Sequence, residues 1–309
     1  MAQEYLKVFA ALEQPVELVG RGEAAVSELE ARFGVPGRSG GVGRMDDLSR
    51  YSAAIVATGV TDLAETAEAV LVRGCRHVLV EKPGALFLPE LLRLQQTAAT
   101  TASEVSVAYN RRFYPSVDAA RNAISEDGGL LSMTFDFTEL EGRARAAHGG
   151  RPDFDVILRR LGVVNSLHVI DLFLHLGGLP SSWEHHVSGS LDWHPSGAIF
   201  SGSGVTDRGI WFSYLSTWSG AGRWGLELTT RNRKLILRPL EQLVWQRRDS
   251  FELESVRLAE EPPGLKVGLG AQVAAFLHQA AGAEPDPRLS TLAEAIRHFE
   301  VAEVILGYS

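Results

Sequence analysis

The chain lacks the features that mark secreted, membrane-bound and nucleic-acid-binding proteins. Its 309 residues contain one cysteine, Cys75, which cannot form an internal disulfide. No apolar run approaches the ~20 residues that a membrane span needs, and no charged and then apolar leader opens the sequence. Acidic residues outnumber basic ones by 38 to 30, and the net charge of -8 disfavours a phosphate-backbone partner. We therefore expect a cytoplasmic protein that binds neither membranes nor nucleic acid.

The composition is that of a packed globular protein. Hydrophobic residues make up 45% and charged residues 22% of a chain that is long enough for two domains. In the N-terminal third, segments with helical spacing of apolar residues alternate with short β-branched runs. We expect helices over 2–12, 23–33, 62–74 and 89–100, and strands over 15–20, 51–59, 75–80 and 104–110. This alternation predicts a right-handed parallel sheet.

One of these strands ends in chemistry-bearing residues. The apolar run Val78-Leu79-Val80 stops abruptly at a carboxylate, an amine and a proline, Glu81-Lys82-Pro83. Such a run is typical of a buried parallel strand, and open α/β sheets bind ligands at the carboxyl ends of their strands. Lys82 is therefore the first candidate for catalysis.

Four segments together resemble the Gfo/Idh/MocA family of oxidoreductases. They are Gly20-Arg21, Ala57-Thr58-Gly59-Val60, Glu81-Lys82-Pro83 and Tyr109-Asn110-Arg111-Arg112-Phe113-Tyr114-Pro115. The resemblance covers nearly the whole chain. It implies an α/β Rossmann domain over residues 1–115, and over residues 116–309 an α+β substrate-binding and oligomerisation domain with a large, mostly antiparallel sheet.

The resemblance also implies a cofactor, a substrate class and a set of site residues. The cofactor is NADP or NAD, and the substrate is a sugar, a nucleotide-linked sugar or a polyol. The lysine that lies by the nicotinamide and the substrate corresponds to Lys82. The residues implied at the cofactor are Arg21, Thr58, Gly59, Glu81, Lys82 and Asn110, and those implied at the substrate are Arg112, Asn165 and His168.

The sequence departs from the family at its beginning. The family opens with a strand and a Gly-x-Gly-x-x-Gly turn, whose glycines let a pyrophosphate approach the backbone, whereas this sequence opens with a helical segment. Gly40, Gly41 and Gly43 do not replace that turn, because no helix start follows them directly, and we expect them in a loop.

The absent strand has a structural consequence. It is central in a sheet ordered 3-2-1-4-5-6, so without it two neighbouring strands lose main-chain partners. Two explanations stay open. Either Met1 is an internal methionine of a longer protein, or the truncation is real and nucleotide binding is weakened or lost.

Arg21 follows a predicted strand at the position where an acidic residue would bind the ribose of NAD. An arginine there suits the 2'-phosphate of NADP better. The alternative is a solvent-exposed arginine in a turn.

The second group of candidate residues lies in a predicted helix over 162–173. His168 and Asp171 are three residues apart and share a helical face, so Asp171 could fix the tautomer of the imidazole. The resemblance assigns proton transfer to His168, with Asp171 as its orienter. Many relatives carry an aspartate four residues before that histidine, where this chain has Val164 and leaves Asn165 as a polar substitute. The alternatives are a buried structural histidine and, less favoured because no fourth ligand is in place, a metal site.

The C-terminal half reads mainly as sheet. Strands are expected over 131–137, 209–218, 224–230 and 234–237, with a hairpin turn over 231–233 and a final helix over 291–306. Four tryptophans could cover the sheet in a homodimer or homotetramer, or one of them could stack on a sugar: Trp211, Trp218, Trp224 and Trp245. The arginine-rich segment 143–160 reads as a loop over the cleft, either gripping an anionic substrate group or simply solvated.

These observations support two functions. The first is an NADP- or NAD-dependent oxidoreductase that moves hydride between a sugar-like substrate and nicotinamide. The second is a catalytically silent relative that serves as a sugar-binding or scaffolding subunit. The absent phosphate turn is the feature that separates them.

Overall fold

The computed structural model describes residues 1–308, and of residues 147 and 148 the backbone alone. The chain forms two compact units, each from two runs of sequence. The first unit comprises residues 1–110 and 261–295, and the second comprises residues 111–260 and 296–308. The expected division at residue 115 therefore omits a segment that returns to the first unit. It returns because β14 (Ser290–Thr291) pairs with β5 (Glu104–Ala108), and α9 (Leu269–Ala280) packs on α1 (Ala2–Ala11).

The first unit contains the expected alternation of helices and strands. Its further elements are β1 (Leu18–Gly20), α2 (Glu23–Phe33), β2 (Gly37–Ser39), η1 (Val42–Arg44), β3 (Ala54–Val56), η2 (Val60–Asp62), α3 (Leu63–Val72), β4 (His77–Glu81) and α4 (Leu88–Thr100). All four predicted helices are present, and α2 ends at Gly34, whose φ of 66° is accessible to glycine at little cost. The sequence analysis did not predict β2, which is only three residues long.

The parallel strands of the first unit form two separate sheets. β3, β4 and β5 pair in parallel, and β14 pairs antiparallel with β5 at the edge. β1 and β2 pair in parallel with each other in a sheet of their own. The sheet is thus divided between β1 and β3. In the expected Rossmann order 3-2-1-4-5-6, this is the place of the strand that comes first in the family's sequence.

The second unit is built on an eight-stranded sheet. Its strands are β6 (Ser132–Phe137), β7 (Pro180–Ser188), β8 (Ile199–Thr206), β9 (Trp211–Thr217), β10 (Trp224–Thr229), β11 (Arg233–Leu237), β12 (Val244–Arg247) and β13 (Leu253–Ser255). Their order is β13-β12-β11-β10-β6-β9-β8-β7, and every pair except β6 with β9 is antiparallel. The predicted large, mostly antiparallel sheet is confirmed, as is the hairpin turn over 231–233.

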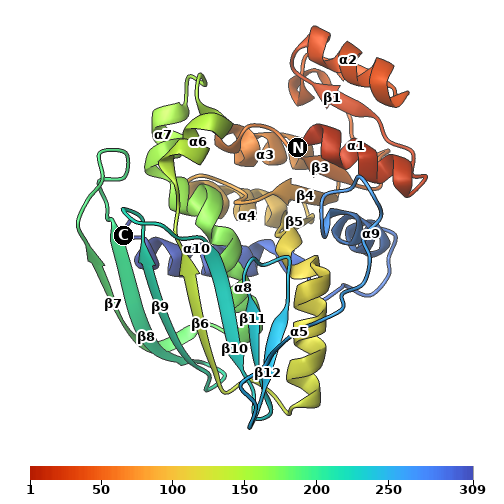
Figure 1. The fold of residues 1–309 in the computed structure, drawn as a ribbon. Coiled ribbons are helices and arrows are strands. Elements are labelled where there is room, and N and C mark those ends of the chain that lie inside the picture. The colour runs from red at the N-terminus through yellow and green to blue at the C-terminus, as the bar shows by residue number, and fades with distance from the viewer. Residues whose placement is uncertain (309) are drawn as a thin grey trace. The chain divides into compact units, whose positions relative to one another are not determined.

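Helical elements of this part of the chain are η3 (Asn110–Phe113), α5 (Pro115–Glu126), α6 (Glu141–His148), α7 (Phe154–Arg159), η4 (Gly162–Ser166), α8 (Leu167–Gly177) and α10 (Leu292–Ile305), whose first turn belongs to the first unit. Figure 1 shows α8 against the sheet, where it contacts β6 and β10. Phe173 of α8 stacks on Phe135 of β6 with ring centroids 4.5 Å apart. Because nearly every side chain of α8 is buried, this helix is the core element of the unit.

Two expectations for this unit were wrong. Residues 143–160 are not a loop but lie mainly in α6 and α7, which are held by a small apolar cluster of Ala144, Leu158 and Leu161 with Phe154 and Trp193. The tryptophans do not form an outer apolar face either. Trp218 and Trp224 are buried, and of the four only Trp211 is largely exposed, at 66%.

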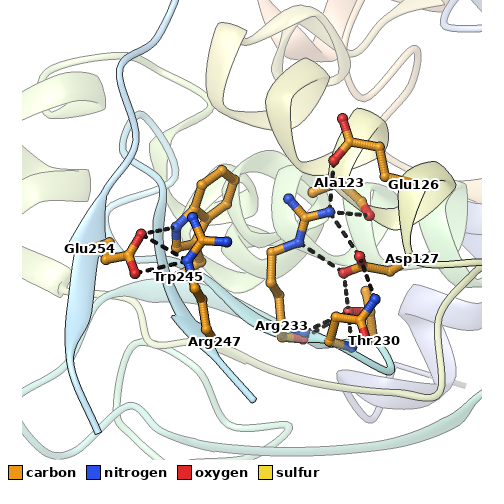
Figure 2. Close-up of polar contacts among 9 residues, drawn as sticks. Ala123, Glu126, Asp127, Thr230, Arg233, Trp245, Arg247 and Glu254 are labelled. Atoms are coloured by element: carbon orange, nitrogen blue, oxygen red, sulfur yellow. Dashed lines mark hydrogen bonds and ion pairs between the residues drawn. The ribbon is translucent and has the colours of Figure 1, made fainter. Parts of the chain in front are cut away.

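An ion-pair cluster ties the β10–β11 hairpin to the end of α5, as Figure 2 shows. Arg233 donates to Asp127 Oδ2 at 2.8 Å and to Glu126 at 2.7 Å, and Thr230 Oγ1 donates to Asp127 at 2.6 Å. These hydrogen bonds, those from Arg233 first, hold the pKa of Asp127 well below its ordinary value. The guanidinium of Arg233 also lies over the ring of Trp245, at 5.0 Å from its centroid.

Acid should therefore weaken this part of the fold. Because the pKa of Asp127 is lower in the folded state than in the unfolded state, the pair stabilises the protein above about pH 4, and this contribution is lost as pH falls through the folded-state pKa. Urea unfolding midpoints measured between neutral pH and about pH 3 should fall less steeply for Asp127→Asn than for the wild type. Asp249→Asn, which changes an exposed carboxylate, is the control and should keep the wild-type slope.

No helix among the described residues is long and apolar enough to cross a membrane.

Candidate functional site

The predicted cofactor residues of the first unit follow three neighbouring strands. Thr58 and Gly59 come after β3, Glu81 ends β4 with Lys82 next, and Asn110 comes shortly after β5. The registers Val56↔Val80 and Glu81↔Ala108 place these strand ends at one edge of the parallel sheet. The structure thus brings these residues together at the edge where open α/β sheets bind ligands.

Glu81 is buried and is held by a residue that the sequence reading did not single out. Tyr5 of α1 donates its hydroxyl hydrogen to Glu81 Oε1 at 2.6 Å. Burial first, and then the Glu81 carboxylate, raise the pKa of Tyr5 well above its ordinary value, so Tyr5 stays a donor. This bond fixes the residue before Lys82, whose own side chain is half-buried.

Asn110 and Arg21 occupy contrasting surroundings. Asn110 is buried and donates from Nδ2 to the carbonyl of Val267 at 2.9 Å, within the same unit. Arg21 is exposed after the end of β1 and forms an ion pair with Asp62, which precedes α3. An anionic ligand group at Arg21 would share the guanidinium with this carboxylate.

A cavity of about 720 Å³ lies between the two sheets of the first unit. All of β1 and all of β3 line it, together with Tyr5, Leu6 and Phe9 of α1. Neither strand has a partner on this side among the strands of the described chain. The expected loss of main-chain partners for two neighbouring strands is therefore confirmed. The cavity has the lining of a slot for one more strand, with apolar side chains and two rows of main-chain polar groups.

Filling this slot should stabilise the protein. A designed segment of about six alternating apolar residues, followed by a glycine-rich turn and fused before Met1, could pair with both strand edges. We expect a gain of about 2 kcal/mol or more, which raises Tm by at least ~3 °C in a chain of this size. A Gly/Ser segment of equal length is the control. Equal Tm values for the two fusions in a calorimetric scan would show that the cavity does not accept a strand.

His168 in the second unit is 2% exposed and contacts an arginine that was not among the predicted site residues. Arg111 Nη1 lies 2.6 Å from His168 Nε2. Since a guanidinium can only donate, Nε2 is the acceptor, and the imidazole is neutral with its hydrogen on Nδ1. The ring of Trp224 packs beside His168 with centroids 5.9 Å apart, and Arg111 lies over the same indole.

Asp171 does not orient His168 as expected. Its carboxylate accepts from Arg112 Nε at 2.9 Å and Nη2 at 2.6 Å, and His298 Nδ1 lies 2.8 Å from Oδ1. Burial alone would raise the pKa of Asp171, but the charge and hydrogen bonds of Arg112 outweigh it and lower the pKa. Arg112 itself is 0% exposed, so its guanidinium is committed to this pair and does not face a ligand as expected.

A buried carboxylate, Glu139, was also missed from the sequence. It lies two residues after β6 and is 5% exposed. It accepts hydrogen bonds from Asn165 Nδ2 at 2.8 Å, Ser166 Oγ at 2.7 Å and Trp224 Nε1 at 3.1 Å. The only hint in the sequence was that an acidic residue follows a predicted strand closely. The residues that donate hydrogen bonds to Glu139 lie more than 25 residues away along the chain, so no rule of sequence spacing connects them to it.

The fold is that of proteins with two units, one built on a Rossmann-like parallel sheet and the other on a large, mostly antiparallel sheet. Residues 1–109 match the profile of the Gfo/Idh/MocA oxidoreductase family, which is described as an NAD-binding Rossmann fold. Over this part the chain is similar to that family, in line with the resemblance seen in its sequence. The predicted enzyme class, an NAD(P)-dependent oxidoreductase, and the predicted cofactor are confirmed at the level of the family. No curated protein sequence matches the chain.

Several solved structures share the fold over nearly the whole chain. UDP-N-acetylglucosamine 3-dehydrogenase from Acidithiobacillus ferrooxidans superposes with a TM-score of 0.75 at 16% identity, covering 99% of this chain and 93% of that one. Levoglucosan dehydrogenase, in complex with NADH and levoglucosan, gives 0.75 at 18% identity with the same coverage. An oxidoreductase from Agrobacterium radiobacter, in complex with NAD+, L-tartaric acid and magnesium, gives 0.76 at 13% identity, covering 98% and 91%. At these identities the similarity establishes the fold.

The donors present fit part of a nicotinamide dinucleotide. An exposed Thr58, a half-buried Lys82 and an exposed Arg21 supply a hydroxyl, an amine and a guanidinium at strand ends of the first unit. These groups suit a nicotinamide ribose and a 2'-phosphate. Among the described residues, no glycine turn joins a strand to α1, so the part that would hold the pyrophosphate is not represented.

Proposed function

We propose that the protein transfers hydride between a nicotinamide cofactor and a carbon of a sugar, a nucleotide-linked sugar or a polyol. The observation that carries the proposal is the array of Thr58, Glu81, Lys82 and Asn110 at the ends of three adjacent parallel strands. The substrate class is supported by the fold shared with enzymes named for UDP-N-acetylglucosamine and levoglucosan.

Each candidate residue has a proposed task. The bound nicotinamide supplies or accepts the hydride. Lys82 donates a proton to the substrate oxygen when a carbonyl becomes a hydroxyl, and accepts that proton in the reverse direction. Glu81, fixed by Tyr5, sets the position of the strand end that carries Lys82. His168 serves as the companion acid or base, with Arg111 rather than Asp171 beside it.

A substrate panel tests this function. The full chain is mixed with NADPH or NADH and a carbonyl compound, or with the oxidised cofactor and UDP-N-acetylglucosamine, levoglucosan or a cyclic polyol. Turnover is followed by nicotinamide absorbance, and cofactor binding by nicotinamide fluorescence. Cofactor-dependent turnover of one class supports the proposal. Cofactor binding without turnover on any class contradicts it.

The second candidate function is a catalytically silent sugar-binding or scaffolding subunit. The divided sheet is the observation behind this function, because among residues 1–308 no glycine turn joins a strand to α1 to hold a pyrophosphate. A protein that binds a sugar but does not bind NADPH at millimolar concentration would support this second function.

We also propose that NADP is preferred over NAD. Arg21 is exposed after the end of β1, and a guanidinium can bind a 2'-phosphate through charge-assisted hydrogen bonds. In fluorescence titrations Arg21→Ala should weaken NADPH binding by about tenfold and leave NADH binding unchanged. Arg38→Ala, which removes the partner of Glu17 in the same unit, is the control. An equal loss for both cofactors would argue against a 2'-phosphate contact.

A homo-oligomer through the eight-stranded sheet is the proposed assembly. Trp211 and Leu215 of β9 are 66% and 62% exposed, and Ile199 of the neighbouring β8 is also exposed. Alternate residues of a strand share a face, so Trp211 and Leu215 form an apolar strip on one side of the sheet. Light scattering on the full chain gives the mass that decides between monomer, dimer and tetramer.

A further inference from the structure

The carboxylate of Glu139 accepts hydrogen bonds from three side chains in the second unit, and one of them, Trp224, packs against His168. An ionised carboxylate only accepts, so Asn165 must turn its Nδ2 toward Glu139 and Trp224 its indole N–H. Ser166 is fully buried and lies closer to Glu139, at 2.7 Å, than to the carbonyl of Phe137, at 3.2 Å. The carboxylate therefore decides which atom each of these groups presents elsewhere.

Asn165 is the member of this set that can meet a ligand. It is half-buried, whereas Glu139, Ser166 and Trp224 are buried. With Nδ2 engaged by Glu139, its Oδ1 is the remaining polar atom, and no described residue donates a hydrogen bond to it. Asn165 and His168 are three residues apart, on either side of the junction between η4, which is a π-helical turn, and α8.

Trp224 extends the influence of Glu139 to the histidine. Its N–H is bound to Glu139, while its ring packs against His168 and under the guanidinium of Arg111. Arg111 in turn contacts His168 Nε2. One carboxylate thus fixes both the amide next to the histidine and the aromatic wall that supports it.

We propose that Glu139 is a positioning residue that holds Asn165 Oδ1 as an acceptor for a hydroxyl group of the substrate. The inference rests on the proposed function, because it takes the surface around His168 to face the substrate. It specifies the chemistry of recognition. A carbonyl-type acceptor beside a neutral imidazole selects a ligand that donates, such as a sugar or polyol hydroxyl, over a carboxylate or phosphate group.

Glu139→Gln tests this arrangement with little change of shape. The new amide can donate, so Asn165 can turn over to accept from it and then presents Nδ2 to the substrate. We expect the Kd for the sugar ligand that the wild type binds, measured by calorimetry with UDP-N-acetylglucosamine and levoglucosan as probes, to rise by about five- to tenfold. Asn165→Ala should give a similar rise, and the double variant should be no worse than either single variant, because both remove the same hydrogen bond. The NADPH Kd and the Tm should stay at their wild-type values in Glu139→Gln.

Glu254→Gln is the matched control. Glu254 also accepts from a tryptophan indole N–H, that of Trp245 at 3.0 Å, but it lies on β13 opposite Trp245 of β12, far from His168 along the chain. This variant should leave sugar binding unchanged.

The outcomes separate the inference from the proposed function. The inference is wrong if the wild type binds a sugar and Glu139→Gln binds it equally well. It is also wrong if the losses of binding free energy in Glu139→Gln and Asn165→Ala add in full in the double variant. A wild type that binds neither probe also overturns it. Calorimetry needs no turnover, so sugar binding weakened by Glu139→Gln in a protein without hydride transfer would support the inference while contradicting the oxidoreductase.

Discussion

Replacing Lys82 by methionine is expected to lower kcat by about 10²- to 10⁴-fold, the usual contribution of a positioned proton donor. Methionine keeps most of the length of the side chain and removes the amine, so packing at the end of β4 should persist. The NADPH Kd and the Tm of the variant should therefore lie close to the wild-type values. The measurement is steady-state turnover on the substrate that the panel identifies, with cofactor titration and calorimetry on the same samples.

Lys234→Met provides the control for this experiment. Lys234 pairs with Glu227 on the surface of the eight-stranded sheet, and such pairs contribute little to stability. Its loss should leave turnover unchanged. If Lys82→Met turned over at the wild-type rate, proton transfer would have to be assigned to another residue.

The second large effect is expected at the buried pair of Arg112 and Asp171. Asp171→Ala leaves the fully buried guanidinium of Arg112 without its carboxylate, which should destabilise the protein by about 3–5 kcal/mol. His298 loses its acceptor in the same variant. Chemical denaturation gives the change in the free energy of unfolding.

A second arginine–aspartate pair, at the surface, is the control that measures how much of the expected loss of stability is due to burial. Arg288 also binds Asp286 through two nitrogens, but both side chains are more than a fifth exposed. Asp286→Ala should cost no more than about 1 kcal/mol, since water can replace the lost partner. Similar losses in the two variants would mean that burial is not what makes the Arg112 pair important.

Local features of the structure could be predicted from the sequence. The helix over 23–33 followed by Gly34, the strand that ends at Glu81-Lys82 and the hairpin over 231–233 all follow from short-range spacing and turn chemistry. So did the division of the parallel sheet, because the order of strands in this fold is regular enough to locate a gap.

The partners of individual side chains could not be predicted in this way. The spacing of His168 and Asp171 favoured a contact between them, yet Asp171 is bound by Arg112, which is 59 residues away. Arg111 and Arg112 are neighbours in sequence, but one contacts His168 and the other is buried under Asp171. Residues 143–160 have little helical periodicity, and their two short helices depend on apolar contacts with distant residues such as Trp193. Such long-range contacts decide the roles of residues and leave no local signal.

The return of residues 261–295 to the first unit governs how the protein can be divided and how it is made. β14 covers the outer edge of β5, and α9 rests on α1, yet both are synthesised after the whole eight-stranded sheet. A ribosome therefore releases the N-terminal strands long before their last neighbours exist, and the open edge of β5 stays available to other chains during that interval. A fragment cut at residue 110 carries the same exposed edge permanently, so genetic dissection of this protein has to rejoin the two runs through a linker.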